Sequence, residues 1–477
     1  MIRYFYFTDE RALPIVGSGF PYATFMPSSP LLIGCASGFS GDRSDGAAAV
    51  VRTLAARGGG TLIFETLAER TLALAQLARN ADPRRGFEPL LDELVAPVLA
   101  DCLRHGIAIV SNFGAANPVG AARRIAELAA QQGLPAPRIA VIHGDALDTP
   151  DQRDLLRQRL GAALDGVEVV SATAYLGATE IAQALAAGAQ IVVAGRVADP
   201  SLTLGPALAH FGWRHDDWPR LGRATMAGHM LECGLQVTGG YFCVPGLKEV
   251  PDVHAAGFPI AEIHADGEFV IGKAADTGGM VDARTVKEQL LYEVHDPARY
   301  LTPDVTADLS QARVEELGRD RVAVRGITGH ARPAELKVNV CHHGGWLAEA
   351  EISYAGVQAE ARARLAADIV HKRLGSALRL RADLIGAISI LDNDAGALRH
   401  DHPGGQARDV RLRIAGEHAE RAIAERVLRE VTALYTCGPA GGGGVRTALR
   451  PRLNMVSCTI PREAVTSGWR FLDEIPQ

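Results

Sequence analysis

The feature that most limits the fold is an alternation of apolar runs and alanine-rich runs between residues 30 and 210. The apolar runs have the length and composition of buried strands, glycine-containing loops follow them, and the alanine-rich runs favour helices. Five strand, loop and helix units of this kind predict an α/β fold with a Rossmann-like parallel sheet and helices on both faces. The expected strands are 31–33, 61–64, 107–110, 138–143, 167–171 and 190–194.

The remainder of the chain predicts two further regions. Residues 213–300 contain two expected helices and, between them, a hairpin that turns at Asp266 and Gly267, so we expect an inserted cap region beside the sheet. From residue 345 the expected order is strand, helix, strand, strand, helix, strand, which is typical of a ferredoxin-like α+β (βαββαβ) domain. The predicted domains are therefore 1–344, an α/β domain with the cap, and 345–477, the ferredoxin-like domain.

Composition excludes several classes of function. The 477 residues are enough for two or three domains, and a net charge of −6 without a basic cluster argues against nucleic acid as the partner. The N-terminal sequence lacks the pattern of a signal peptide, and no run of about 18 apolar residues follows, so we expect a cytoplasmic protein with no membrane contact. Seven cysteines without a C-x-x-C pair argue against disulfides and structural zinc, and we expect no metal site.

Polar side chains recur in the loops after the expected strands, which is where ligands bind in open α/β sheets. Each loop leads into a helix N-terminus, whose free amide groups favour anions. We therefore expect a site for a small anionic substrate. In this site Arg43 and Arg196 contact a carboxylate or phosphate, and a desolvated carboxyl group moves a proton. The alternative is that these residues only cap helices and form ion pairs. The predicted catalytic residues are Glu65 and Asp199, and the predicted substrate-binding residues are Ser37, Asp42, Arg43, Asn112, Asn117 and Arg196.

Two other motifs carry candidate residues. His229 and Cys233 share one helix face in "GHMLECG", so His229 is placed to activate a thiolate, whereas the alternative is an ordinary buried cysteine, because cysteine is among the residues most often simply buried. The glycine cluster "GPAGGGGVR" allows close approach of its backbone to an anion, with Gly441, Gly442 and Arg446 as candidates, or else it is a flexible loop between domains.

These motifs resemble the AtuA family of acyclic terpene utilisation proteins. The resemblance covers about residues 30 to 460 and is carried by "IGCASGFSGDR", "FETLAERT", "SNFGAANP", "AGRVADPSLTLGP", "DDWPRLGRATMAGHMLECGLQVTGG" and "LYTCGPAGGGGVR". It implies a component of a catabolic cluster that processes branched acyl-CoA compounds. Many relatives also have a further ferredoxin-fold piece, fused or separate, which implies a small ferredoxin-fold partner protein here.

Together these observations favour an enzyme of lyase or hydratase type that acts on a small carboxylate or branched acyl-CoA metabolite. In that reading Glu65 or Asp199 moves the proton, and no cofactor is firmly implied beyond CoA as a part of the substrate. A second reading is a non-catalytic scaffold or subunit of a catabolic complex, and a third is a cysteine-dependent acyl transferase or hydrolase that uses Cys233. A homo-oligomer is expected on general grounds.

Overall fold

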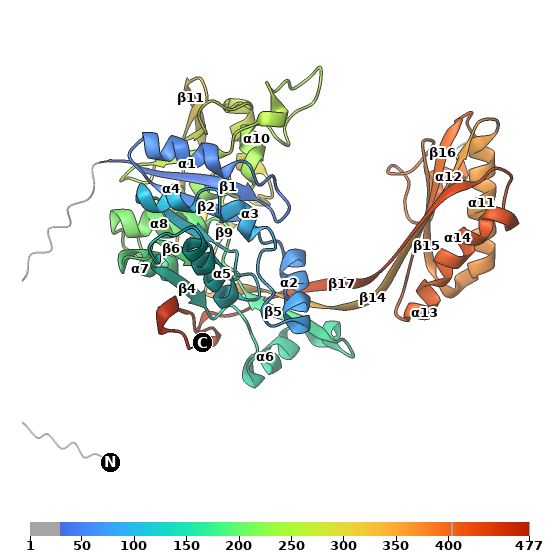
Figure 1. Ribbon diagram of the computed structural model, residues 1–477, viewed down its shortest axis with the longest axis horizontal. Coiled ribbons are helices and arrows are strands. Elements are labelled where there is room, and N and C mark those ends of the chain that lie inside the picture. The colour runs from blue at the N-terminus through green and yellow to red at the C-terminus, as the bar shows by residue number, and fades with distance from the viewer. Residues whose placement is uncertain (1–28, 402–403, 477) are drawn as a thin grey trace, which may run out of the picture.

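The chain folds into two bodies that are joined by two long strands, β14 (Glu335–Ala355) and β17 (Gly443–Pro461), as Figure 1 shows. The structure is a computed structural model, and it describes residues 29–401 and 404–476. The larger body contains a mixed ten-stranded sheet with helices, and the smaller body contains the remaining helices on an antiparallel sheet. The α/β class expected from the sequence is confirmed.

Five parallel strands form the centre of the large sheet, in the order β1-β2-β3-β6-β4. Their residues are almost all buried, because helices cover both faces of the sheet and leave no solvent-facing side. Antiparallel strands extend the sheet beyond both edges of this parallel centre. The central strands are β1 (Leu31–Gly38), β2 (Thr61–Glu65), β3 (Ala108–Ser111), β6 (Ile191–Val193) and β4 (Ile139–His143).

The helices of the larger body lie on opposite faces of the sheet, each with an apolar side turned inward. One face is covered by α1 (Ala47–Ala56), α3 (Leu91–Val95), α4 (Leu99–Arg104) and α5 (Pro118–Gln131). The other is covered by α7 (Thr179–Ala186), α8 (Ser201–Phe211), α9 (Trp218–Glu232) and α10 (Ala283–Leu291). The larger body also contains α2 (Glu69–Ala81), α6 (Pro150–Leu160) and a three-stranded sheet of β9 (Tyr300–Leu301), β10 (Thr306–Asp308) and β13 (Thr328–His330).

One expected strand lies outside the parallel sheet, so its predicted position is wrong. Strand β5 (Val169–Ala174), expected at 167–171, pairs antiparallel with β14 instead of joining β6. A central strand is buried on both faces, whereas β5 leaves Val169 46% exposed and Val170 and Ala172 only partly buried, which suits a strand outside the buried centre of the sheet.

The expected hairpin is present, but it continues the main sheet. Strands β7 (Pro259–Ile263) and β8 (Phe269–Lys273) pair with each other, and β7 also pairs antiparallel with β1. Strands β12 (Arg321–Arg325) and β11 (Arg313–Gly318) extend the same edge. This part of the region expected as a cap therefore belongs to the sheet. At the opposite edge β18 (Gly468–Phe471), expected in the second domain, pairs with β4 of the larger body.

The smaller body has the strand order β15-β16-β14-β17, and every neighbouring pair is antiparallel. Its elements follow β14 as α11 (Ala359–Leu374), β15 (Arg379–Ile385), α12 (Ala397–Asp401), β16 (Asp409–His418), α13 (Arg421–Ala424), α14 (Arg426–Cys437) and β17. Helices α11 and α14 bury the apolar side of this sheet. Strand β14 pairs with β5 through His342 and with β16 from Trp346, so a single strand runs through both bodies.

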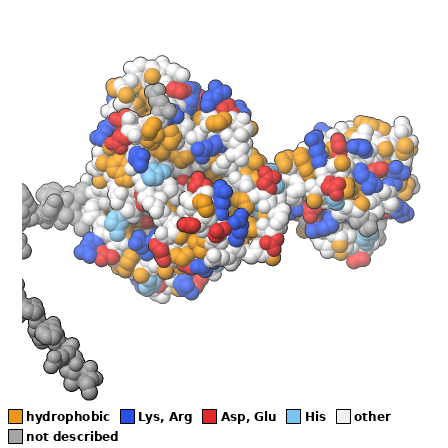
Figure 2. All heavy atoms as spheres, turned by 90° about the horizontal axis from the view of Figure 1, so that it is seen from below, with side chains coloured by type: hydrophobic (Ala, Val, Ile, Leu, Met, Phe, Trp, Pro, Cys, Tyr) orange, Lys and Arg blue, Asp and Glu red, His pale blue; other side chains and the backbone are white. Residues whose placement is uncertain are grey.

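Figure 2 shows a narrow neck between the two bodies and basic and acidic side chains interspersed over the smaller one. Across residues 29–401 and 404–476, no helix is both long and apolar enough to cross a membrane.

Candidate functional site

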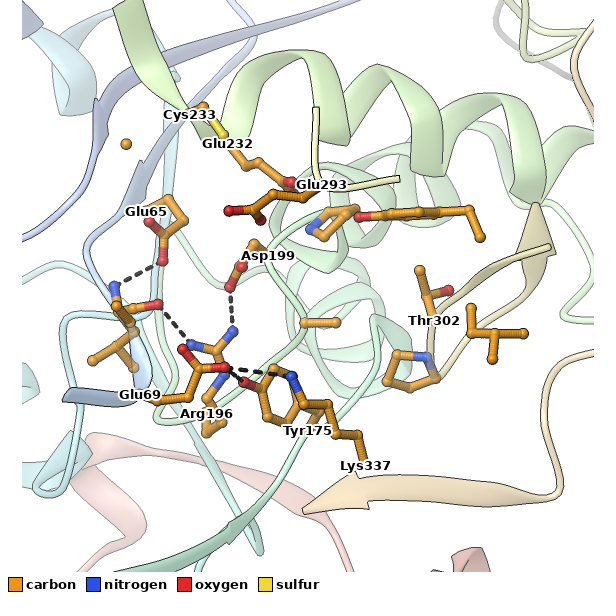
Figure 3. Close-up of a pocket in the computed structure, with 18 of the residues that line it drawn as sticks. Glu65, Glu69, Tyr175, Arg196, Asp199, Glu232, Cys233, Glu293, Thr302 and Lys337 are labelled. Carbon is orange, nitrogen blue, oxygen red and sulfur yellow. Dashed lines mark hydrogen bonds and ion pairs between the residues drawn. The ribbon is translucent and has the colours of Figure 1, made fainter. Parts of the chain in front are cut away.

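A cavity of about 990 Å³ lies at the carboxyl ends of the parallel strands. Strand β2 ends in the cavity at Glu65, and the loop after β6 supplies Arg196 and Asp199. The end of α9, the turn after α10 and the first residues of β14 form the other walls, as Figure 3 shows. The position agrees with the rule that ligands of open α/β sheets bind beyond the carboxyl ends of the strands.

Arg196 is a fixed cation at the base of the cavity, with 2% of its surface exposed. One guanidinium nitrogen donates to the carbonyl oxygen of Leu67 at 2.7 Å, and the other forms an ion pair with Asp199. The guanidinium carbon lies 4.2 Å from the centre of the Tyr175 ring, which is a cation–π distance. Three groups therefore hold the arginine in place before any ligand binds.

Glu65 is a buried carboxyl group whose orientation is set by two hydrogen bonds. Its Oε1 accepts from the backbone N–H of Leu67 at 2.7 Å and from the side-chain amide of Asn112 at 2.8 Å. Burial, and then the nearby charge of Asp199, raise the pKa of Glu65 well above its usual value, although Arg196 and the two hydrogen bonds act in the opposite direction. Glu65 is therefore a candidate for a carboxylic acid that is neutral near pH 7.

Asp199 faces the cavity from the other side of Arg196, with 34% of its side chain exposed. Burial raises the pKa of this carboxyl group even though the Arg196 guanidinium opposes the change. Two acids with raised pKa values thus flank one permanent cation. This arrangement can store and move a proton.

A second group of residues lies beside Arg196 (Figure 3). The Tyr175 hydroxyl donates to Glu69 Oε1 at 2.6 Å, and Lys337 Nζ lies 3.3 Å from the same oxygen. Burial acts to raise the pKa of Glu69, but the hydrogen bond from Tyr175 and the charge of Lys337 lower it to about 2. Glu69 is therefore ionised at neutral pH, in contrast to Glu65.

The predicted pairing of His229 with Cys233 is wrong. His229 Nδ1 lies 2.9 Å from Glu232 Oε1, and Nε2 lies 2.9 Å from the carbonyl oxygen of Gln289, so both ring nitrogens have other partners. Cys233 ends α9 and lines the cavity, but burial raises the pKa of its thiol. The geometry thus lacks the basic or cationic neighbour that thiolate chemistry requires.

The predicted loop residues have different roles in the structure. Ser37 supports the cavity from behind, because its hydroxyl donates to the carbonyl oxygen of Glu65 at 2.8 Å. Asp42 lines the cavity but accepts a hydrogen bond from the Gly38 N–H at 2.7 Å, as in an ordinary turn. Asn112 acts through Glu65 and Thr66 rather than on a ligand.

The remaining predicted contacts lie away from the cavity. Arg43 pairs with Asp45 and donates to the carbonyl oxygen of His254, so its place in the substrate site is not supported. Asn117 caps α5 by accepting from the Gly120 N–H. The glycine cluster and its arginine belong to the smaller body, on the far side of the neck. Gly441 and Gly442 directly precede β17, and Arg446 lies in β17.

Several cavity residues were not predicted as site residues. Glu69 and Tyr175 follow β2 and β5, and the sequence places both among the polar residues after the expected strands, but without a catalytic or binding role. No local signal marks Lys337, Tyr300 or Glu293 as cavity residues. Lys337 lies in β14, Tyr300 in β9 and Glu293 in the turn after α10, and all three follow β6 by more than 90 residues. Glu293 has a positive φ of 59°, a conformation that costs energy for a residue other than glycine and that often marks functional sites.

Comparison with known proteins gives one match. A family model described as "Acyclic terpene utilisation family protein AtuA" matches residues 31–471, which is nearly the whole chain. No curated protein and no solved structure matches. Within the described part of the chain, no three His, Cys, Asp or Glu side chains are grouped so that they could hold a metal ion.

Proposed function

The chain belongs to the acyclic terpene utilisation family AtuA, and we propose that it is a catabolic enzyme of lyase or hydratase type acting on a small carboxylate or branched acyl-CoA metabolite. The observation that carries this proposal is the buried Glu65 and the partly exposed Asp199 beside the fixed Arg196 at the ends of the parallel strands. Adding or removing water at a carbon–carbon double bond requires a group that gives or takes a proton at a fixed position. A carboxyl group with a raised pKa meets this requirement near neutral pH.

The balance of charge favours an acyl thioester over a free carboxylate. Lys337 and Arg196 are the basic side chains of the cavity wall, and each already contacts a carboxylate. A thioester carbonyl is neutral, so it avoids repulsion by the ionised acids that face the cavity, which include Glu69 and Glu335.

In the proposed reaction Arg196 orients the thioester carbonyl and Glu65 or Asp199 moves the proton. Asn112 keeps Glu65 aimed at the cavity, and it is a positioning residue because its amide contacts Glu65. CoA is part of the substrate in this scheme, and the nucleotide portion of CoA would remain outside the cavity.

A ligand screen followed by a turnover assay tests the proposal. The full chain is screened by thermal shift against free CoA, linear and branched acyl-CoAs, and short-chain carboxylic acids, and each stabilising acyl-CoA is then followed by ¹H NMR. We expect an acyl-CoA to raise the melting temperature more than free CoA does and to gain or lose water. Stabilisation by carboxylic acids alone would contradict the preference for thioesters, and absence of any hit would contradict the enzyme proposal.

One observation favours a second candidate, a scaffold or subunit of a catabolic complex. The smaller body is held away from the larger one by two strands, and it exposes Ile390 and Leu391 almost completely, at 91% and 86%. Adjacent apolar residues exposed to this extent suit contact with another chain. A homo-oligomer and a small ferredoxin-fold partner remain our proposals for that contact. Size-exclusion chromatography with light scattering would test the first of these.

The finer fold assignment is also a proposal. We assign the parallel centre with helices on both faces to the Rossmann-like class and the smaller body to the ferredoxin-like class. The smaller body supports this assignment through its order β15-β16-β14-β17 and its two helices on one face. We also propose a cytoplasmic location.

A further inference from the structure

Beside the acids of the proposed mechanism, the cavity is lined by Glu232, which pairs with the buried His229. His229 is 1% exposed and Glu232 is 8% exposed. Both lie on α9, three residues apart, so the helix itself brings the imidazole and the carboxyl group to one face. Glu232 Oε1 lies 2.9 Å from Nδ1, while Oε2 is buried and has no hydrogen-bond partner among the described residues.

The hydrogen-bond partners fix where the protons lie. The carbonyl oxygen of Gln289 can only accept, so His229 Nε2 carries a hydrogen and donates it at 2.9 Å. If the imidazole is neutral, its Nδ1 has no hydrogen and must accept one, and Glu232 can supply it only as a carboxylic acid. The surroundings favour this state, because burial lowers the pKa of His229 to about 4 and raises that of Glu232 well above its usual value.

Glu232 is the member of the pair that lines the cavity, while its unpartnered Oε2 is itself buried. Figure 3 shows its carboxyl group close to those of Glu293 and Asp199. A buried carboxylate with an unpartnered oxygen would be costly, whereas a carboxylic acid that donates through Oε1 leaves a neutral Oε2. The charged and titratable groups around the pair are Asp199, Glu293, Arg196, Tyr300 and Cys233.

We propose that His229 and Glu232 form a proton relay of this site, in which Glu232 is a further catalytic residue and His229 a positioning residue that stores the proton. Glu232 Oε2 takes a proton from the ligand while the proton on Oε1 passes to His229 Nδ1. The imidazole becomes cationic, the ligand gains one negative charge and the carboxyl group remains neutral. The reverse transfer returns the proton to the ligand, so each turnover is balanced.

This inference rests on the proposed function, but its first test does not need a substrate. Infrared difference spectra between the wild-type chain and Glu232→Gln at pH 7 report whether Glu232 is a carboxylic acid, and ¹⁵N-histidine NMR of the same samples reports the form of His229. We expect loss of one carboxylic acid band in Glu232→Gln and a neutral Nε2–H imidazole in the wild-type chain. An ionised Glu232 beside an imidazolium at pH 7 would overturn the proposal.

The Tyr300 hydroxyl is the competing donor, because it lies 3.5 Å from His229 Nδ1. Tyr300→Phe should leave the carboxylic acid band and the His229 tautomer unchanged. A loss of the band or a change of tautomer in Tyr300→Phe would assign the shared proton to the tyrosine and refute the relay. His210→Asn, on the neighbouring helix α8, is the control for assigning the histidine signals.

The second test uses the acyl-CoA that the ligand screen identifies. Glu232→Gln should lower kcat by about 10²- to 10⁴-fold, the range typical of a lost general acid or base. His229→Asn should lower kcat and also shift the acidic limb of the pH profile, which a purely structural role would not do. A normal kcat in a folded Glu232→Gln protein would remove the relay from the mechanism while leaving the proposed function intact.

Discussion

The cavity and the open face of the smaller sheet both contain many charged side chains, but the charges are arranged in opposite ways. On the smaller sheet, basic and acidic residues alternate between strands, as where Arg413 contacts both Asp383 and Glu349. In the cavity the acids outnumber the two cations, and two of them, Glu65 and Glu232, are buried. Paired charges near solvent contribute little beyond solubility, whereas unmatched buried acids are expensive and are kept where they act.

The largest expected effect comes from replacing a single cavity acid. Glu65→Gln should reduce turnover of the identified acyl-CoA by about 10²- to 10⁴-fold, because an amide retains the hydrogen-bonding shape but cannot exchange a proton. The melting temperature should change little, since an amide keeps the hydrogen-bonding shape of a carboxyl group whose charged form is disfavoured by burial. Steady-state kinetics and a thermal melt measure both effects.

The matched control is Glu349→Gln in the smaller body, which also removes one glutamate and should leave turnover unchanged. Equal loss of activity in the two variants would show that charge in the cavity has no special role.

The buried arginine gives the largest expected effect on stability. Arg196→Met leaves Asp199 without its cation and breaks the contact with the Leu67 carbonyl, so the free energy of unfolding should fall by about 3–5 kcal/mol. Arg450→Met, which removes the exposed pair with Glu349, should cost under about 1 kcal/mol. Urea denaturation of both variants checks the difference, and similar costs would contradict the contrast between the two regions.

Cysteine reactivity should also differ between the regions. Cys437 is exposed in the smaller body, whereas Cys233 has a thiol pKa that burial raises. Iodoacetamide should therefore modify Cys437 at least about ten times faster than Cys233. Peptide mass mapping over time measures both rates in one sample. Rapid modification of Cys233 would revive the cysteine-dependent mechanism.

The smallest expected effect concerns Glu69. Its pKa is lowered to about 2 in the folded protein, so its contribution to stability is complete above its ordinary pKa near 4.5 and disappears between pH 4.5 and 2. Tyr175→Phe removes the donor to Glu69 and should cost about 1 kcal/mol at pH 7, with a smaller cost as the pH falls through this window.

Tyr435→Phe in the smaller body is the control, because the Tyr435 hydroxyl accepts a hydrogen bond from the Val445 N–H at an exposed position. Its effect should stay below about 0.5 kcal/mol and should not depend on pH. A pH-independent cost in Tyr175→Phe would refute the account of Glu69.

Periodicity predicted the parts of the fold that depend on local patterns. Apolar runs predicted the parallel strands and the helices that connect these strands, and turn residues predicted the hairpin at Asp266 and Gly267. The pairing of β5 with β14 and the return of β18 to the larger body depend on segments far apart in sequence, and periodicity contains no information about such partners.

The site shows the same division. Residues at strand ends, such as Glu65 and Asp199, were found because the strand-end rule is local. Lys337 was missed because only the folding of β14 against β5 brings it to the cavity. The helix spacing correctly placed His229 near Glu232, but only the structure shows that its nitrogens face Glu232 and Gln289 rather than Cys233.

Burial raises the pKa values of Glu65 and Asp199 in the cavity, whereas the pKa of the neighbouring Glu69 is lowered to about 2. ¹³C NMR of side-chain carboxyl carbons in the labelled full chain measures this directly, with assignments from Glu65→Gln, Asp199→Asn and Glu69→Gln. The account predicts that Glu65 still gives a protonated signal at pH 6, that Asp199 titrates above its ordinary range, and that Glu69 remains ionised below pH 4. Ionisation of all three carboxyl groups near their ordinary pKa values would contradict it.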